Sequence, residues 1–318
     1  MTSTIGTNLQ TIIRECVEEA EINLAEKTAR NYHQAIRRFL KYLEAEGIEP
    51  DKALDIQHFQ NFTIWLAHQD YARGSRRTYL SGLRYFVEWL ILSEYLDVPQ
   101  AQMLRFKRMC ENVNRRRESR LPQFVPNEKL KAMLESARKR KEAKPIKQRD
   151  IAAILLLYTS GCRNEELCLL DVEDIDLENR KARVVGKGSK EAYIFFTPET
   201  AKAIDAYWKA RGNREPTSPA FSRHDRGIKR GELAHLTPNG LRYIINKIAK
   251  SAGIDPREIS PHKFRHGFGI RALQKTGSLA KTQDLLRHAN PATTRIYAKI
   301  AQEELKEAYD TIFEDDDE

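Results

Sequence analysis

Three short blocks in the second half of the chain contain side chains that could act together on a phosphodiester. Arg163 opens an expected helix directly after a glycine turn, and His262 and Arg265 stand three residues apart, on one face of a later helix. His288 and Tyr297 follow near the end of the chain, nine residues apart. Arginine can give paired hydrogen bonds to phosphate oxygens, imidazoles can move protons, and a phenol can attack phosphorus. The blocks therefore contain groups for anion binding, proton transfer and nucleophilic attack.

A sixth candidate, Lys187, lies in the turn-rich segment 186–189, between β-branched and aromatic runs at 180–185 and 193–197. Two such runs separated by glycines predict a β-hairpin. Transfer of a DNA strand needs a nucleophile, cationic donors for the charge on the nonbridging oxygens, and a proton source for the departing oxygen. With Lys187, the second half of the chain has a candidate for each of these roles.

Each candidate has a plainer explanation when it is taken alone. A single arginine such as Arg163 is usually a surface or capping residue, a lysine in a glycine turn is usually solvated, and Tyr297 is one of twelve tyrosines. His262 and His266 stand four apart and could mimic a zinc-binding pair, but the chain has no His-Glu-x-x-His motif. We therefore expect no metal, and only the joint occurrence of the blocks supports a catalytic role.

The blocks, in this order, resemble those of the tyrosine recombinase (phage integrase) family. The matching segments are Thr-Ser-Gly-Cys-Arg-Asn-Glu-Glu-Leu (159–167), Gly-Lys-Gly-Ser-Lys (186–190), Pro-His-Lys-Phe-Arg-His-Gly-Phe (261–268), Leu-Leu-Arg-His (285–288) and Thr-Thr-Arg-Ile-Tyr (293–297). The architecture resembles the family over the whole chain, but the specific motifs lie in the second half. Two positions depart from the pattern: Arg287 replaces the usual glycine before His288, and Cys162 precedes Arg163 where other small residues are common.

The resemblance implies a role for each residue of the blocks. Arg163 and Arg265 would clamp the scissile phosphate, and His288 would donate a hydrogen bond to a nonbridging oxygen. Tyr297 would be the nucleophile and form a 3′-phosphotyrosine bond, with His262 placed to take the phenolic proton. Because a free tyrosine has a pKa of about 10, a base and a cationic neighbourhood are needed.

By the same resemblance, Lys187 would be the general acid for the 5′-hydroxyl leaving group. The phosphotyrosine bond would conserve the energy of the broken linkage, so no ATP, metal or other cofactor is expected. The leading hypothesis is an enzyme, a site-specific DNA recombinase that exchanges strands between two short sites in a tetrameric synapse, for integration and excision or for dimer resolution. The alternatives are type IB topoisomerase-like relaxation of DNA and a non-catalytic DNA-binding protein derived from an integrase.

The composition suits a polyanionic partner. The 318 residues include 54 Lys and Arg against 45 Asp and Glu, which gives a net charge of +9 and favours double-stranded DNA. Seven basic residues and two acidic ones lie within 105–120, which we interpret as contacts to a phosphate backbone, with a solvated loop as the alternative. The basic residues are Arg105, Lys107, Arg108, Arg115, Arg116, Arg117 and Arg120.

The compartment can also be predicted. The N-terminus lacks the basic and apolar regions of a secretory signal, and no run approaches the ~18 apolar residues of a membrane span. Four scattered cysteines without a C-x-x-C pair suit buried, reduced thiols. We expect a cytoplasmic, nucleoid-associated protein that does not contact a membrane.

The elements that must position the site are mostly helical. Apolar residues at helical spacing predict four amphipathic helices in the first third of the chain, enough for a small bundle. The expected fold is mainly α with a small β-hairpin or sheet (α+β). Its domains would be a helical core-binding domain that clamps DNA (1–107), a basic linker (108–124) and a tyrosine recombinase catalytic domain (125–318).

The segment after the last block, residues 302–313, has apolar residues at helical spacing, among them Leu305, Tyr309 and Ile312. In the family such a segment docks on a neighbouring subunit, so the resemblance implies a homotetramer on DNA joined partly by this segment. Packing on its own subunit is the alternative. The acidic tail, 314–318, is assigned no function.

Overall fold

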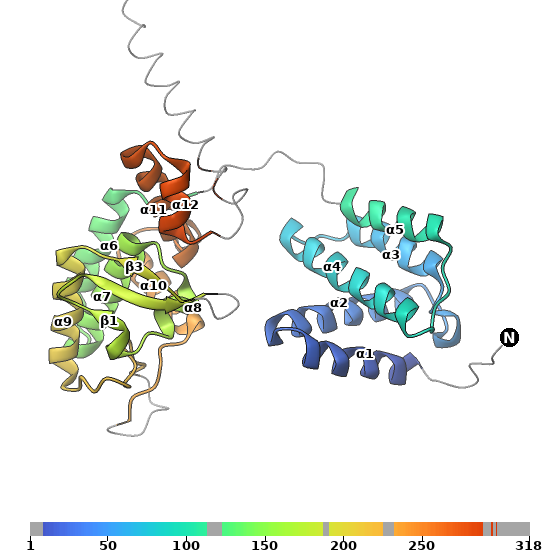
Figure 1. The fold of residues 1–318 in the computed structure, drawn as a ribbon, viewed down its shortest axis with the longest axis horizontal. Coiled ribbons are helices and arrows are strands. Elements are labelled where there is room, and N and C mark those ends of the chain that lie inside the picture. The colour runs from blue at the N-terminus through green and yellow to red at the C-terminus, as the bar shows by residue number, and fades with distance from the viewer. Residues whose placement is uncertain are drawn as a thin grey trace, which may run out of the picture. The chain divides into compact units, whose positions relative to one another are not determined.

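A computed structural model describes residues 9–112, 123–186, 191–224 and 232–288, together with Thr294 and Tyr297. The chain divides into two compact units, residues 1–119 and 120–318 (Figure 1). Within the described residues, no helix is both long and apolar enough to cross a membrane. The four cysteines are free and buried. The fold is mainly helical with one small sheet, as the sequence predicts.

The first unit is a helical bundle with an aromatic core. Its helices are α1 (Leu9–Asn23), α2 (Glu26–Ala45), α3 (Ile56–His68), α4 (Arg73–Leu92) and α5 (Gln100–Asn112), with a short 3-10 turn, η1 (Pro50–Lys52). Phe39 of α2 stacks on Phe59 of α3 with ring centroids 4.5 Å apart, and Phe62 meets it edge-on. All three rings are fully buried. The apolar stripes seen in the sequence therefore form one core between the helices.

Helix α5 extends into the segment that the sequence analysis assigns to the linker. Phe106 and Cys110 on its inner face are buried, and α5 packs against α3 and α4. Residues 108–112 of the predicted linker are therefore helical, and residues 113–122 lie outside the described residues. The basic residues that surround Phe106 and Cys110 hide the apolar spacing in the sequence. The exact domain boundaries stay a prediction.

The second unit surrounds the buried helix α7. Its elements are α6 (Asn127–Lys139), α7 (Lys144–Ser160), α8 (Asn164–Cys168), η2 (Val172–Asp174), β1 (Ile175–Asp176), β2 (Lys181–Val185), β3 (Glu191–Phe195), α9 (Pro198–Arg211), α10 (Pro238–Ser251), η3 (Pro256–Glu258), α11 (Pro261–Thr276) and α12 (Leu279–Leu286). Helix α7 packs against α6, α9 and α11. Its residues 149–157 are buried without interruption, which explains why it lacks an amphipathic pattern.

The predicted hairpin is formed by β2 and β3, which pair antiparallel with Ala182 opposite Ile194. Both side chains are buried, so this face of the sheet belongs to the core. The two-residue strand β1 pairs with β2 and gives the sheet the order β1-β2-β3. A strand of two residues has no alternating pattern that could reveal it in a sequence.

The turn between α7 and α8 requires a glycine for two reasons. Gly161 has φ +60°, in the left-handed region, and a Cβ at this position would lie 2.5 Å from the ring of Phe268 on α11. Gly161 therefore ends α7 and leaves room for Phe268, so that α11 packs closely against this turn. Arg163 follows directly as the N-cap of α8, so its position is fixed by this contact.

Candidate active site

Arg163 is held at the start of α8 by Glu166 of the same helix. The backbone N–H of Arg163 donates to Glu166 Oε2 at 2.8 Å, and its Nη1 donates to Glu166 Oε1 at 2.6 Å. The Arg163 side chain is 43% exposed, whereas that of Glu166 is 3% exposed. Burial acts to raise the pKa of the Glu166 carboxyl, but Arg287 and Arg163 outweigh it, so this pKa lies below its usual value. Glu166 is therefore a buried carboxylate.

Arg265 lies on α11 and joins three segments of the second unit. Its guanidinium donates to the carbonyl of Gly161 at 2.6 Å and to the carbonyl of Leu286 at the end of α12. The residue is 4% exposed, and burial, followed by the charges of Arg163 and Arg287, lowers its pKa to about 10. At neutral pH it is still a cation. These contacts fix the guanidinium without using a carboxylate.

Arg163, His262 and Arg265 line one cavity of about 390 Å³. The first turn of α11 also borders this cavity, and the N-terminal end of a helix favours an anion. A further cation, Arg242 of α10, lines it as well, although the sequence analysis did not single it out. The full lining is Cys162, Arg163, Asn164, Glu165, Arg242, Ser260, Pro261, His262 and Arg265. Three arginines around one cavity can bind a phosphate.

Tyr297 is buried and is connected to this cavity through His266, whose ring contacts both Tyr297 and the cavity residue His262. It is 2% exposed and packs with Ile270 and Leu273 of α11 and with Leu286. Its hydroxyl is 2.9 Å from Nδ1 of His266. Burial raises the pKa of Tyr297, and the charge of Arg265 opposes this rise. The phenol is therefore protonated at neutral pH, and its hydroxyl shares a hydrogen bond with His266.

The imidazole within hydrogen-bond distance of the Tyr297 hydroxyl is thus His266, whereas the resemblance assigns acceptance of the tyrosine proton to His262. The rings of His262 and His266 are neighbours, with centroids 4.3 Å apart. Burial lowers the pKa of both, to about 4 for His266, with Arg265 contributing to each. Both are therefore neutral at pH 7. The sequence signal for His266 is its position one helical turn after His262, a spacing that by itself suggests only a metal-binding pair.

His288 completes the cluster. Its ring is stacked with the ring of Tyr297 at a centroid distance of 6.4 Å, and its Nδ1 is 2.9 Å from Thr294 Oγ1. Burial, followed by the charges of Arg265 and Arg163, lowers its pKa to about 4. His262, His266, Tyr297 and His288 thus form a continuous series of ring contacts. Among the described residues, no group of three or more His, Cys, Asp or Glu could hold a metal.

The structure brings together Arg163, His262, Arg265, His288 and Tyr297, five of the six residues that the sequence analysis selected. The sixth, Lys187, lies outside the described residues. Of the basic residues predicted to contact DNA, Arg105 and Arg108 are exposed on α5, and Lys107 is 3.2 Å from Glu88. The remaining four, Arg115, Arg116, Arg117 and Arg120, lie outside the described residues.

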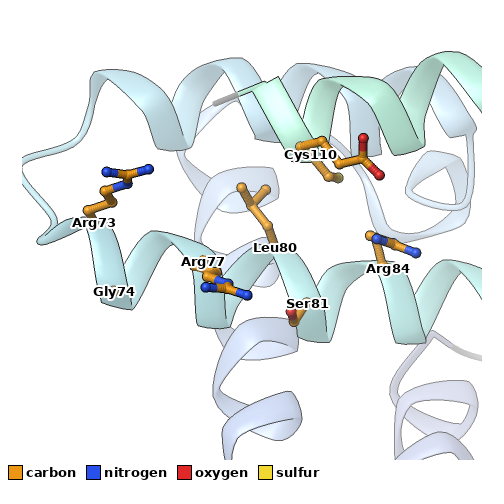
Figure 2. A pocket seen from close by; sticks show the side chains of 8 residues that line it. Arg73, Gly74, Arg77, Leu80, Ser81, Arg84 and Cys110 are labelled. Atoms are coloured by element: carbon orange, nitrogen blue, oxygen red, sulfur yellow. The ribbon is translucent and has the colours of Figure 1, made fainter. Parts of the chain in front are cut away.

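A second basic surface, which the sequence analysis did not select, lies on the first unit. Arg73, Arg77 and Arg84 are spaced along α4 beside a cavity of about 620 Å³, with Cys110 of α5 on the opposite side (Figure 2). Ser81 and Leu80 lie between the arginines. We call this the α4 basic face. Positive side chains along one side of a helix suit contacts to the phosphates of a duplex.

Comparisons with known proteins match both units of the chain. Residues 123–304 match the phage integrase family, and residues 19–94 match the phage integrase N-terminal SAM-like domain. The tyrosine recombinase XerC of Staphylococcus haemolyticus is 30% identical over 295 residues, which cover 92% of each chain. XerC of Staphylococcus aureus is 31% identical over 294 residues, with the same coverage.

Solved structures show the same fold at lower identity. The XerH site-specific recombinase, bound to palindromic difH substrate in a post-cleavage complex, is 20% identical with a TM-score of 0.71, covering 96% of this chain and 85% of that one. The Tn1549 transposon integrase in complex with transposon right end DNA is 16% identical with a TM-score of 0.66, covering 94% and 100%. Together with the clustered site, these matches show that the chain belongs to the phage integrase family and is a site-specific tyrosine recombinase, an enzyme that cleaves and rejoins DNA.

Proposed function

We propose that this recombinase exchanges strands between two short double-stranded DNA sites through a 3′-phosphotyrosine bond formed by Tyr297. The observation that carries the proposal is the position of Tyr297: its phenol is hydrogen-bonded to His266, whose ring contacts His262 in a cavity lined by three arginines. A phosphate in this cavity would bind to the arginines, and the phenol would have an imidazole nearby as a proton acceptor. These are the requirements of nucleophilic attack on a phosphodiester.

In the proposed reaction the scissile phosphate binds in the cavity between Arg163 and Arg265. Arg265 is already fixed by two carbonyls, so little reorganisation is needed when charge builds up on the nonbridging oxygens. Arg163 is partly exposed and can turn one edge of its guanidinium toward the phosphate. His288, adjacent to the same arginines, would donate to a nonbridging oxygen.

The nucleophile must move before it can react, because a side chain that is 2% exposed cannot reach a DNA phosphate. His266 would hold Tyr297 in the buried arrangement, and His262, which lines the cavity, would accept the phenolic proton at the phosphate. The Tyr297 oxygen then forms a bond to phosphorus, and the bond from phosphorus to the 5′-oxygen breaks. Lys187 would give a proton to that oxygen. Attack by the 5′-hydroxyl of another strand reverses these steps and completes the exchange.

A pair of tyrosine variants tests the nucleophile. We expect Tyr297→Phe to abolish covalent attachment to a nicked suicide substrate while duplex binding is retained. Tyr207→Phe is the matched control, because Tyr207 is also buried and its hydroxyl is 3.1 Å from His224 Nε2. This control should keep the adduct although it loses this hydrogen bond and the one that the Tyr207 hydroxyl accepts from the backbone N–H of Ser222. An adduct of normal yield in Tyr297→Phe would move the nucleophile elsewhere.

The α4 basic face would contact the phosphate backbone of the duplex. Its arginines and the exposed Arg105 and Arg108 of α5 would neutralise phosphates without reading bases. The residues of the predicted linker beyond α5 would extend this contact. Such contacts fix the position of the enzyme on its site, so they are expected to affect binding more than chemistry.

We further propose that the enzyme works as a homotetramer in the cytoplasm, associated with the nucleoid, and that residues 302–313 dock on a neighbouring subunit. Two sites have four strands to cut, and one tyrosine per subunit supplies one cut each, which supports four subunits. Truncation at Gln302 should prevent synaptic tetramers on DNA while monomer binding persists.

A plasmid assay tests the strand exchange itself. A plasmid carrying two sites should give recombinants, whereas relaxation without recombinants would contradict the proposed exchange.

A further inference from the structure

Arg287 combines an unusual backbone with a mostly buried charge. It follows α12 with φ +55° and ψ +46°, the left-handed conformation that favours glycine at the end of a helix. Among the described residues other than glycine, Glu94 and Arg180 also have a positive φ, but both are exposed. The side chain of Arg287 is only 11% exposed. A strained backbone that holds a buried charge suggests a function for that charge.

The charge of Arg287 meets the carboxylate that orients Arg163. Its Nη2 lies 2.7 Å from Glu166 Oε2, while Glu166 Oε1 accepts from Arg163 Nη1 at 2.6 Å. The carbonyl of Arg287 also accepts a weaker contact from Arg163 Nη2 at 3.4 Å. Arg163 is therefore linked to Arg287 through both the shared carboxylate and the backbone.

The shared carboxylate creates an electrostatic problem for phosphate binding. Glu166 is a buried anion beside a cavity that must accept another anion, and it contacts the arginine expected to bind that anion. Without a second cation, Glu166 would offset the charge of Arg163 and repel the phosphate. Arg287 supplies that cation, so the charges of Arg163 and Arg265 remain available to the phosphate.

We propose that Arg287 is a positioning residue for the recombination reaction: it holds and neutralises Glu166, so that Arg163 faces the phosphate with an uncompensated charge. The proposal rests on the proposed function of the cavity. Arg287 does not line that cavity, and its Nη1 donates to the carbonyl of Leu285 at 3.1 Å, so its guanidinium is turned inward. It therefore acts through Glu166 and not by contact with the substrate.

The test compares three Arg287 variants by the single-turnover rate of covalent adduct formation on a suicide substrate, at saturating enzyme. Arg287→Gln should be slower by about 10- to 100-fold, the range expected when a reacting group is misplaced. Arg287→Lys keeps a cation and should recover most of the rate. Arg287→Gly relaxes the backbone but lacks the charge, and it should be as slow as Arg287→Gln. Thermal melts identify any variant that fails to fold.

A double variant separates positioning from a purely structural role. Glu166→Gln removes the anion that Arg287 neutralises, so adding Arg287→Gln to it should produce no further loss of rate. Independent, multiplicative losses would overturn the proposal, as would a wild-type rate in Arg287→Gln or equal rates in the Lys and Gln variants. Adduct formation by the unaltered enzyme serves as the reference, so failure of the proposed function would be seen first and separately.

Discussion

Gly269 of α11 lies where any larger residue would collide with the buried nucleophile. A Cβ at this position would be 2.8 Å from Cζ and 2.9 Å from Cε2 of Tyr297, and 3.0 Å from a methyl group of Leu286. Ordinary contacts of this type are longer by about half an ångström or more. We therefore expect Gly269→Ala to disfavour the buried arrangement of Tyr297 and to increase the fraction of molecules in which this side chain is released.

The size of the effect follows from the cost of overpacking. One extra methyl group in a filled core costs about 1–3 kcal/mol. The gain in helix propensity from glycine to alanine, about 1 kcal/mol, applies to both arrangements and cancels. The released fraction should therefore rise by about 5- to 150-fold, since each 1.36 kcal/mol is a factor of ten.

Chemical acetylation of tyrosines by N-acetylimidazole, followed by peptide mass mapping, measures this fraction directly. The rate of modification at Tyr297 should rise in Gly269→Ala by the factor given above. Gly267→Ala is the matched control on the same helix, because the three atoms nearest to its Cβ would belong to Arg271 (3.2 Å), Val125 (3.4 Å) and Phe124 (3.6 Å), and none to Tyr297. Unchanged modification in Gly269→Ala, or an equal rise in both variants, would refute the reasoning.

Three further predictions concern the site, the duplex and pH. A lysine at position 265 cannot contact both carbonyls and also bind a phosphate, so Arg265→Lys should lower the rate of adduct formation by at least about 100-fold. A smaller fall would contradict the proposal that Arg265 is a fixed donor to the nonbridging oxygens. Arg77→Ala should lower the slope of log affinity against log salt by about 0.9, measured on a duplex, and an unchanged slope would remove it from the interface. Burial lowers the pKa of His224, His266 and His288 to about 4, so the unfolded chain takes up more protons between that value and about 6.5. Stability in urea should thus be full above pH 6.5 and decline as the pH falls toward 4, whereas a constant stability over this range would contradict the buried, neutral imidazoles.

The sequence predicts much of this site because its residues lie in local patterns that fix them. A glycine turn before Arg163, and the spacing of His262 and Arg265 on one helix, each determine a position within a few residues. The apolar stripes likewise predict the helices that carry these residues. The family and its fold follow from the order of the blocks, and the comparisons confirm both.

Contacts between distant segments could not be predicted in this way. His266 and Tyr297 are 31 residues apart, and the packing of Tyr297 against α11 brings them into hydrogen-bond contact. Arg242 reaches the cavity from α10, and the buried pair of Arg287 with Glu166 spans 121 residues. Helix α5 was missed for a different reason, since its short apolar stripe is embedded among basic residues.

Identification of the residue and the DNA end in the covalent complex tests the central claim most directly. The enzyme is reacted with a suicide duplex, the complex is digested with protease, and the DNA-linked peptide is sequenced by mass spectrometry. We expect the 3′-phosphate of the DNA to be linked to Tyr297, with a free 5′-hydroxyl on the other strand end. A linkage to a different residue, or to a 5′-phosphate, would contradict the mechanism.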